Sequence, residues 1–470
     1  MHRINTGNSI TGRRFSSCLI VAFIIRLITA SPAHCQGTQP DNQAQAQQTA
    51  LSPVKLEAAV NTAVNDNPTL KNSLLDASIA RDRISAARSQ FYPHVKVSTL
   101  GLQLLTPLNF GFDKGVFGSF ASTGPIPSQN TNVSTGLEPV LIVNTLIAQP
   151  ISQIPRIRLG VRQLEIAQEI ARQKFKVQRQ QLVSDVKHAY YKALELEDAL
   201  KVVQATETLY QEIERTTNEY RQRKMVLPAD AIEVKQQLAN TQYEALKLRN
   251  ALASQKEELN HMLGRNLQSN LTLFAPGDAP EADIDLAAAI TRAKNNRAEL
   301  RQAQMQSEQI DLERKIKKLQ YLPELSVAFD YLSVFGTQVL PRNVVMAGLL
   351  LNWEPIDWGR RHAEISEQRK LWHQANNSMH ETETQITIEV NNAYRSLQEG
   401  KQFLQVAQLG RQLALERLRV ATDKYAAQAV LLKDVLQAQR DLTQANNQYS
   451  QAVLALWRAR ADFQKAVGEE

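Results

Sequence analysis

Residues 182–203 read LVSDVKHAYYKALELEDALKVV, and residues 386–407 read ITIEVNNAYRSLQEGKQFLQVA. In both stretches apolar or small residues recur at alternating spacings of four and three, which is typical of a helix that packs in a coiled coil. The matching positions are Leu182, Val186, Ala189, Ala193, Leu196, Leu200 and Val203, then Ile386, Val390, Ala393, Leu397, Gly400, Leu404 and Ala407. The constant offset of 204 residues indicates that one unit occurs twice.

Two further sets of residues support this duplication. Leu56, Ala59, Val60, Ala63, Leu70, Pro93, Val95 and Val97 recur 230 positions later as Leu286, Ala289, Ile290, Ala293, Leu300, Pro323, Leu325 and Val327. The offset of 204 also maps Leu238, Thr241, Ala245, Leu248 and Leu252 onto Leu442, Ala445, Tyr449, Ala452 and Leu456. The change of offset places an extra segment of about 26 residues between Pro93 and Pro150.

Each copy is expected to contain the same elements in the same order. A short amphipathic helix (54–64 or 285–293) meets an asparagine-rich break, after which Pro68 suits the first position of the next helix. Prolines then separate helix from strand-like runs, because proline cannot continue a helix. These prolines are Pro93 and Pro150 in the first copy and Pro323 and Pro355 in the second.

Very long helices are predicted after the strands. Neither Gly nor Pro occurs between Val161 and Leu227, a span that would reach roughly 100 Å as one helix. The last segment alternates large and small positions, which lets a neighbouring helix approach closely. These positions are Leu442, Ala445, Tyr449, Ala452, Leu456, Ala459, Phe463 and Ala466. We expect two helical hairpins, with tips near 225–230 and 426–434.

Four runs of 10 or 11 residues are predicted to be strands, at 95–105, 140–149, 324–334 and 344–353. The third alternates most clearly, with Val327, Phe329 and Tyr331 on one face, and the length suits a tilted strand that crosses a bilayer. Between the first two lies a long Gly-, Ser-, Asn- and Pro-rich loop that contains Phe110, Phe112, Phe117 and Phe120. Four strands cannot close a barrel, so strands in a membrane would require several copies, twelve strands in a trimer. The alternative is a small soluble sheet within a periplasmic coiled-coil protein.

The N-terminus has the features of an export signal. Arg3, Arg13 and Arg14 precede an apolar run over 18–30, and Ser31-Pro32-Ala33 provides a cleavage site. An alternative is a lipoprotein signal, in which Cys35 would be lipidated. The predicted segments are a signal peptide over 1–33, a flexible segment over 34–53, a first repeat over 54–264, a linker over 265–284, a second repeat over 285–467 and a tail over 468–470.

Composition excludes several classes of protein. Gly and Pro together make up only about 7 % of the chain, which favours long helices over a disordered or collagen-like chain. Removing the leader takes away four arginines and no acidic residue, so the formal charge falls from +7 to +3, too little to indicate nucleic-acid binding.

Motifs for metal binding or catalysis are not found in the sequence. His373 and His380 share a helical face without a third metal ligand nearby, and no phosphate loop or nucleophile motif occurs. We therefore expect neither an enzyme nor a bound cofactor or metal.

The ordered set of motifs resembles the TolC-like outer-membrane efflux proteins, also called outer-membrane factors. It extends over 54–467 and is carried by the duplication and by Tyr92-Pro93, Leu322-Pro323, Gln149-Pro150, Trp353-Glu354-Pro355, Ala189-Tyr190, Ala393-Tyr394 and 434–442. The resemblance implies a mainly α homotrimer with a shared 12-stranded barrel in the outer membrane of a Gram-negative bacterium and a periplasmic helical tunnel. It also implies passive export, in efflux or type I secretion, of substrates delivered by an inner-membrane transporter through a periplasmic adaptor.

The resemblance also implies roles for residues at the hairpin tips. Asp434 and its counterpart Asp230 fall where the family has acidic residues at a periplasmic aperture, and Gln437 stands where some relatives have a second acid. Each aspartate equally suits the first turn of a helix, whose dipole favours negative charge. The tip residues that would contact an adaptor are Met225, Val226, Leu227, Pro228, Ala429, Val430 and Leu431. Arg223 and Gln428 replace the glycines that the family favours three residues after the aromatic of each tip.

Two other functions fit part of the pattern. A periplasmic adaptor also has an export signal and a long helical hairpin, but it would have one hairpin between β-rich domains. A filamentous scaffold would not need paired strands bounded by prolines in each repeat.

Overall fold

A computed structural model describes residues 54–134, 136–223, 227–275, 284–336, 341–427, 429–430 and 432–469. The first repeat contains α2 (Leu56–Asp66), α3 (Pro68–Arg88), β1 (His94–Gln103), β6 (Pro139–Pro150), α4 (Ile154–Gln222) and α5 (Pro228–Met262). The second repeat contains α6 (Leu286–Asn296), α7 (Ala298–Leu319), β7 (Glu324–Phe335), β8 (Asn343–Asn352), α8 (Arg360–Ala426) and α9 (Leu432–Val467). The predicted signal peptide, the flexible segment and Cys35 lie outside the described residues.

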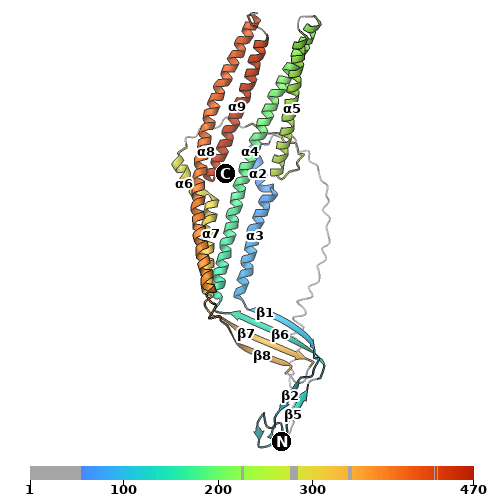
Figure 1. Ribbon diagram of the computed structural model, residues 1–470, viewed down its shortest axis with the longest axis vertical. Coiled ribbons are helices and arrows are strands. Elements are labelled where there is room, and N and C mark those ends of the chain that lie inside the picture. The colour runs from blue at the N-terminus through green and yellow to red at the C-terminus, as the bar shows by residue number, and fades with distance from the viewer. Residues whose placement is uncertain are drawn as a thin grey trace, which may run out of the picture. The chain divides into compact units, whose positions relative to one another are not determined.

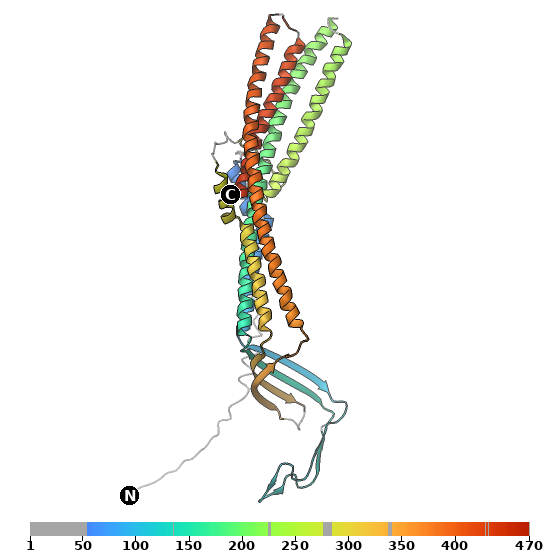
Figure 2. The same cartoon turned by 60° about the vertical axis from the view of Figure 1, so that its left-hand side comes forward.

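The two repeats have matching elements, as the duplicated sequence predicts (Figure 1). The hairpins α4–α5 and α8–α9 lie side by side, and the four strands lie at the other ends of α4 and α8 (Figure 2). α4 is continuous over 69 residues and α8 over 67, which corresponds to about 100 Å for each. The large and small positions of α9 are buried against its neighbours, with Tyr449 half-buried.

The helix start at Pro68 follows the expected chemistry. Asn67 caps α3, since its side-chain oxygen accepts a hydrogen bond from the Leu70 N–H, and Pro68 occupies the first helical position. The Asn67 amide also donates to the Met262 carbonyl at the end of α5. At the equivalent place in the second repeat, the buried Arg297 donates to the Ala466 carbonyl at the end of α9. Different side chains therefore satisfy the same helix-end carbonyl in the two repeats.

Both hairpins end in a glycine cap of the same geometry. Gly264 and Gly468 follow α5 and α9 with φ of 67° and 83°, in the left-handed region that glycine adopts without strain. In each case the next residue returns its N–H to a carbonyl five residues earlier, Arg265 to Asn260 and Glu469 to Gln464. These caps turn the chain sharply where each hairpin meets its repeat's short helix.

We expect Gly264→Ala to destabilise the protein more than Gly468→Ala. A left-handed conformation costs alanine about 1–2 kcal/mol at either site. At Gly264 the new Cβ would also lie 2.7 Å from the Asp66 carbonyl oxygen, whereas at Gly468 its nearest neighbour is the Asn296 Cβ at 3.1 Å. Urea unfolding of the two variants measures the difference, and equal losses would show that the backbone at Asp66 yields.

The largest buried cluster surrounds Tyr190 on α4. It joins α2, α4 and the end of α5 with Leu271 and Leu273, which follow α5 and lie over the cluster. The Tyr190 hydroxyl shares its proton between the Val54 and Phe274 carbonyls, both at 2.8 Å, and accepts from the Phe274 N–H at 2.9 Å. Burial raises the pKa of Tyr190, and it raises the pKa of the neighbouring Tyr191 to about 12. The Tyr190 hydroxyl therefore binds the backbone at Val54 and at Phe274 to α4.

We expect Tyr190→Phe to release the segment 271–275 from α4. The substitution keeps the ring but leaves partly buried backbone groups of Val54 and Phe274 without the hydroxyl, which costs about 1 kcal/mol for each lost hydrogen bond. Limited proteolysis should then cut within 271–275, and the urea midpoint should fall. The matched control is Tyr394→Phe at the equivalent position of the second repeat, where the ring packs against Phe463. Equal sensitivity of the two variants would contradict this role for Tyr190.

The four predicted strands form one antiparallel sheet in the order β1-β6-β7-β8. The region expected to be a plain loop is more ordered than predicted. It contains the ladder of β2 (Asn109–Phe112) with β5 (Thr131–Ser134) and the short pair β3 (Ser119–Phe120) and β4 (Gly124–Pro125). Glycines with positive φ at 115, 118 and 124 permit these turns. Among the helices of the described residues, none is long and apolar enough to span a membrane.

Candidate functional site

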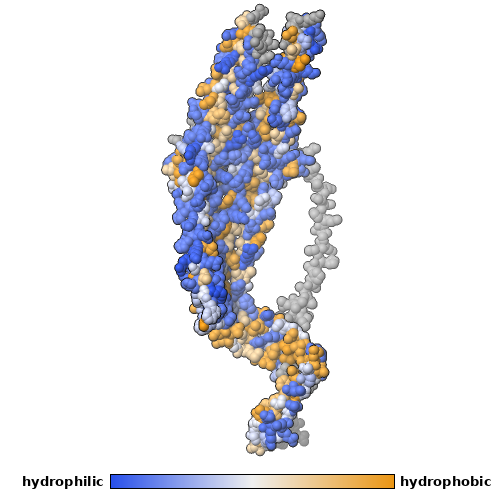
Figure 3. Space-filling model, viewed as in Figure 1, coloured by the Kyte–Doolittle hydropathy of each residue, from blue (hydrophilic) through white to orange (hydrophobic). Residues whose placement is uncertain are grey.

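One face of the four-stranded sheet is apolar across all four strands. Antiparallel partners in register lie on the same face, so Val97, Thr145, Tyr331 and Val345 form one cross-strand row. The neighbouring rows of this face add Val95, Ile147, Phe329 and Ala347, then Val327 and Leu349. Hydrophobic side chains gather over the sheet, whereas the helical surface in the same view is mostly hydrophilic (Figure 3). The register thus assigns the faces of β1, β6 and β8, whose own alternation is weaker than that of β7.

The opposite face of the sheet carries polar side chains at its centre. Lys96, Leu146, Asp330 and Met346 form one row, and Ser98, Asn144, Leu332 and Val344 form the next. The Oδ1 atoms of Asn144 and Asp330 are buried and accept no hydrogen bond from the described residues. A sheet that is apolar on one face and carries polar groups at the centre of the other suits a wall between lipid and water.

The molecule has open edges at every level. In the sheet of the described chain, β1 and β8 each pair on one side only. In the hairpin region α5 packs on α4, α4 on α9 and α9 on α8, and nearer the sheet the order is α3, α4, α7 and α8. One outer member always comes from the first repeat (β1, α3 or α5) and the other from the second (β8 or α8).

The outer helices expose apolar stripes along these edges. On α5 the exposed residues are Ile232, Tyr243 and Leu246, and on α8 they are Phe403, Val406, Leu409 and Leu413. Leu74, Leu75 and Ile79 are exposed on α3. Contiguous exposed apolar surface on a folded chain marks an interaction site. The two edges are different surfaces, so an assembly through them would be head to tail, an arrangement that forms a ring when the rotation between copies closes.

The hairpin tips lie where the sequence predicts them. Leu227 and Pro228 are exposed at the start of α5, and Ala429 and Val430 lie between α8 and α9. The other three predicted tip residues, Met225, Val226 and Leu431, lie outside the described residues. Both hairpins point the same way, which brings the two tips to one end of the helices (Figure 1).

The three predicted aperture residues all lie in the first turns after the tips. Asp230 is in the first turn of α5, and Asp434 is exposed in the first turn of α9. Gln437, one turn further along α9, donates to Asp441 Oδ1 at 2.8 Å. The structure thus brings Asp434 and Gln437 together on one helix and places Asp230 on the other hairpin.

A polar link between the hairpins has no counterpart among the sequence-based expectations. Arg440 of α9 donates from Nε to the Tyr210 hydroxyl of α4 at 2.7 Å, and its guanidinium lies 5.8 Å from the centre of the Tyr210 ring. The link borders a cavity of about 250 Å³ between α4, α5 and α9, lined mainly by threonine, glutamine and asparagine side chains. Tyr210 lies seven residues after Val203 in the coiled-coil pattern, which could have identified it as buried, but nothing in the sequence pairs it with Arg440.

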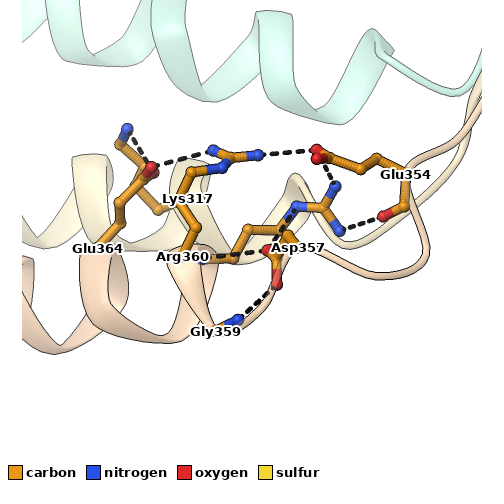
Figure 4. Close-up of polar contacts among 7 residues, drawn as sticks. Lys317, Glu354, Asp357, Gly359, Arg360 and Glu364 are labelled. Carbon is orange, nitrogen blue, oxygen red and sulfur yellow. Dashed lines mark hydrogen bonds and ion pairs between the residues drawn. The ribbon is translucent and has the colours of Figure 1, made fainter.

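A charged cluster joins the sheet to α8 (Figure 4). Arg361 is buried, donates to the Glu354 carbonyl at 2.7 Å and forms ion pairs with the carboxylates of Glu354 and Asp357. Arg360 pairs with Glu354 and Glu364 on the surface. In the sequence Glu354 stands out only within the Trp353–Pro355 motif, and nothing there predicts this cluster.

Backbone groups also hold the Asp357 carboxylate in this cluster. The N–H of Arg361, and after it the N–H of Gly359, lower the pKa of Asp357 by donating to its carboxylate. Hydrogen bonds from Lys317 and Arg360 lower the pKa of Glu364. The stabilisation from these carboxylates is present at neutral pH and is lost as the pH falls through the lowered values.

In the described part of the chain, no group of three His, Cys, Asp or Glu side chains could hold a metal ion. His373 lies beside Trp372, with ring centroids 5.0 Å apart, and His380 lies 3.9 Å from Glu383.

No protein-family model matches the chain, and no curated protein sequence matches it significantly. Solved structures do match. The Campylobacter jejuni CmeC outer membrane channel has a TM-score of 0.73 and 14 % identity, over 88 % of this chain and 85 % of that one. The Vibrio cholerae outer membrane protein VceC gives 0.69 and 13 %, over 88 % and 96 %. The open state of the Neisseria gonorrhoeae MtrE outer membrane channel gives 0.68 and 15 %, over 88 % and 89 %. These matches confirm the predicted TolC-like fold.

Proposed function

We propose that this chain, with its TolC-like fold, is one subunit of a homotrimeric outer-membrane channel. Three copies would supply a 12-stranded barrel in the outer membrane of a Gram-negative bacterium, and their helices would continue it as a periplasmic tunnel. The channel conducts substrates passively and has no catalytic step or cofactor. An inner-membrane transporter and a periplasmic adaptor would deliver the substrates, in efflux or in type I secretion.

The observation that carries this proposal is the open edge at every level of the molecule. Four strands leave β1 and β8 with backbone groups that no strand of the described chain pairs, and each such group in lipid costs several kcal/mol. The smallest bacterial barrels have about eight strands, so one copy is too small. Because α3, α5 and α8 are open on the same two sides, a single head-to-tail contact between copies would cover the sheet and helix edges together.

The two faces of the sheet support the membrane location. The apolar rows that include Val97 and Phe329 would face lipid, and the polar rows that include Lys96 and Asp330 would face the water-filled lumen. Each of the four strands has 10 to 12 residues, enough to cross the hydrocarbon layer when tilted. The proposed adaptor surface is at the hairpin tips, around Leu227, Pro228, Ala429 and Val430, with Met225, Val226 and Leu431 beside them in the sequence.

An adaptor or a filamentous scaffold is the alternative function. An adaptor would have one hairpin, whereas this chain has two. A scaffold would not need a sheet with one apolar face and polar groups at the centre of the other. Fractionation of cells that produce the chain distinguishes these functions. If the chain is a channel, we expect trimers in the outer membrane that dissociate only on heating. If it is an adaptor or a scaffold, we expect a periplasmic protein that dissolves without detergent.

We expect Asp434→Ala to raise the ion conductance of the purified channel in planar bilayers. Asp434 lines one small pocket with Arg417 and Lys424 of α8, so its removal would weaken the attraction between α8 and α9 that holds the second tip at the aperture of the proposed trimer. The matched control is Asp423→Ala, which removes an exposed acid from α8 near the same tip. Unchanged conductance in Asp434→Ala would leave that residue only the role of an acid in the first turn of α9.

A further inference from the structure

The segment between β1 and β6 builds a ribbon of its own. We call residues 109–134 the outer ribbon; β2 and β5 form its stem, and β3 and β4 form its tip. It extends away from the four-stranded sheet (Figure 2). Hydrogen bonds from Gly115 to Pro127 and from Phe117 to Ile126 hold the tip, and the Phe112 and Phe117 rings lie 5.2 Å apart. The second repeat has no counterpart, because only seven residues separate β7 from β8.

The tip of the ribbon exposes a cluster of large apolar side chains, which we call the tip patch. It consists of Val116, Phe117, Phe120 and Ile126, each between 41 % and 60 % exposed. A two-stranded ribbon is marginally stable alone in water and needs a further strand or a packing partner. An apolar cluster at the end of such a ribbon therefore indicates a covered surface.

Membrane hydrocarbon does not suit the ribbon as its covering. Both outer edges of the β2–β5 ladder carry backbone groups that no strand of the described chain pairs, and such edges do not occur in lipid. Asp113 and Lys114 are exposed next to the tip patch, and the polar run Ser128-Gln129-Asn130 lies on the return to β5. These groups require water or protein around the ribbon.

The position of the ribbon identifies the partner. It follows directly on β1, the edge strand that pairs with β8 of the next copy in the proposed trimer. Gln103 at the end of β1, Phe335 at the end of β7 and Asn343 at the start of β8 all lie at the same end of the sheet. The ribbon therefore leaves the barrel at the boundary between two copies.

We propose that the tip patch of each copy packs against the outer region of a neighbouring copy, so that three ribbons form a collar at the outer mouth of the channel. This inference rests on the proposed function. It gives the extra residues of the first repeat a role in assembly, and it accounts for the phenylalanines that a purely polar loop would not need.

Photocrosslinking of the full chain tests the collar. Ser119→Cys, made in a Cys35→Ser background and labelled with benzophenone maleimide, places the probe beside Phe120. On illumination of the assembled protein we expect covalent dimers and trimers that survive boiling. The matched control is Ser128→Cys in the polar run of the same ribbon, from which we expect a several-fold lower yield. A second variant, Phe117→Ser with Phe120→Ser, should lower the temperature at which trimers dissociate.

Three results would overturn the collar. In the first, the protein has the size of a trimer but Ser119→Cys gives no crosslink between copies. In the second, the probe crosslinks mainly to lipid or lipopolysaccharide. The third is a Phe117→Ser, Phe120→Ser trimer as heat-stable as the parent. In each case the trimer persists and the proposed function stands. A protein that is monomeric before illumination would instead remove the proposed function itself.

Discussion

Replacing Val97 by arginine is expected to prevent assembly in the outer membrane, whereas replacing the next residue, Ser98, by arginine should leave assembly intact. Val97 lies on the apolar face in the row of Thr145 and Tyr331, which are near the middle of β6 and β7. An arginine that faces lipid near the bilayer centre costs about 2–4 kcal/mol in each subunit. In the proposed trimer three subunits share one barrel, so the assembly would bear this cost three times.

Ser98 provides a control at the neighbouring position. It lies on the polar face in the same row as Asn144, so an arginine there would extend into the lumen. We expect heat-modifiable trimers at the level of the parent protein and a shift of ion selectivity toward anions in planar bilayers. If Val97→Arg assembles normally, or if both variants fail alike, the assignment of the two faces is wrong.

The second large effect is expected at the junction of the sheet with α8. Arg361→Ala removes a buried guanidinium that holds the Glu354 carbonyl and two carboxylates and lies over the Tyr321 ring, 5.6 Å from its centre. We expect a loss of about 2 kcal/mol in unfolding free energy, because the Glu354 carbonyl loses a charged donor that the fold buries. Proteolysis should become fast between Trp353 and Arg360.

Arg360→Ala is the matched control for this cluster. Arg360 is exposed and forms surface ion pairs with Glu354 and Glu364, which contribute little because water screens them. A loss in Arg360→Ala as large as that in Arg361→Ala would show that surface charge, and not the buried guanidinium, holds the junction.

In the parent protein the same segment, between Trp353 and Arg360, should become protease-sensitive in acid. This should happen below the ordinary titration range of aspartate, because the pKa of Asp357 is lowered.

Much of the architecture could be predicted because it depends on local rules. Asn67 and Pro68 specify a helix start, and the absence of Gly and Pro from Val161 to Leu227 permits one long helix. Comparison of the two repeats supports each of these assignments a second time, since the main helices and strands occur in both. The same comparison accounts for the glycine caps at Gly264 and Gly468, which end equivalent helices.

Features that depend on distant pairing could not be predicted. Residues 140–147 of β6 read VLIVNTLI, which is too uniformly apolar to assign a face, and only its register with β1 and β7 does so. Arg440 and Tyr210 are 230 residues apart, and no local pattern joins them. The outer ribbon resembles a loop in the sequence because its short strands are only two to four residues long.

The number of copies in the detergent-solubilised protein tests the central claim most directly. Native mass spectrometry of the mature chain, extracted from outer membranes, measures that number without an assumed shape. The open edges β1 and β8 and the outer helices α3, α5 and α8 require more than one copy, and the proposed TolC-like channel sets the expected number at three. A stable single copy, with these edges uncovered, would contradict the account.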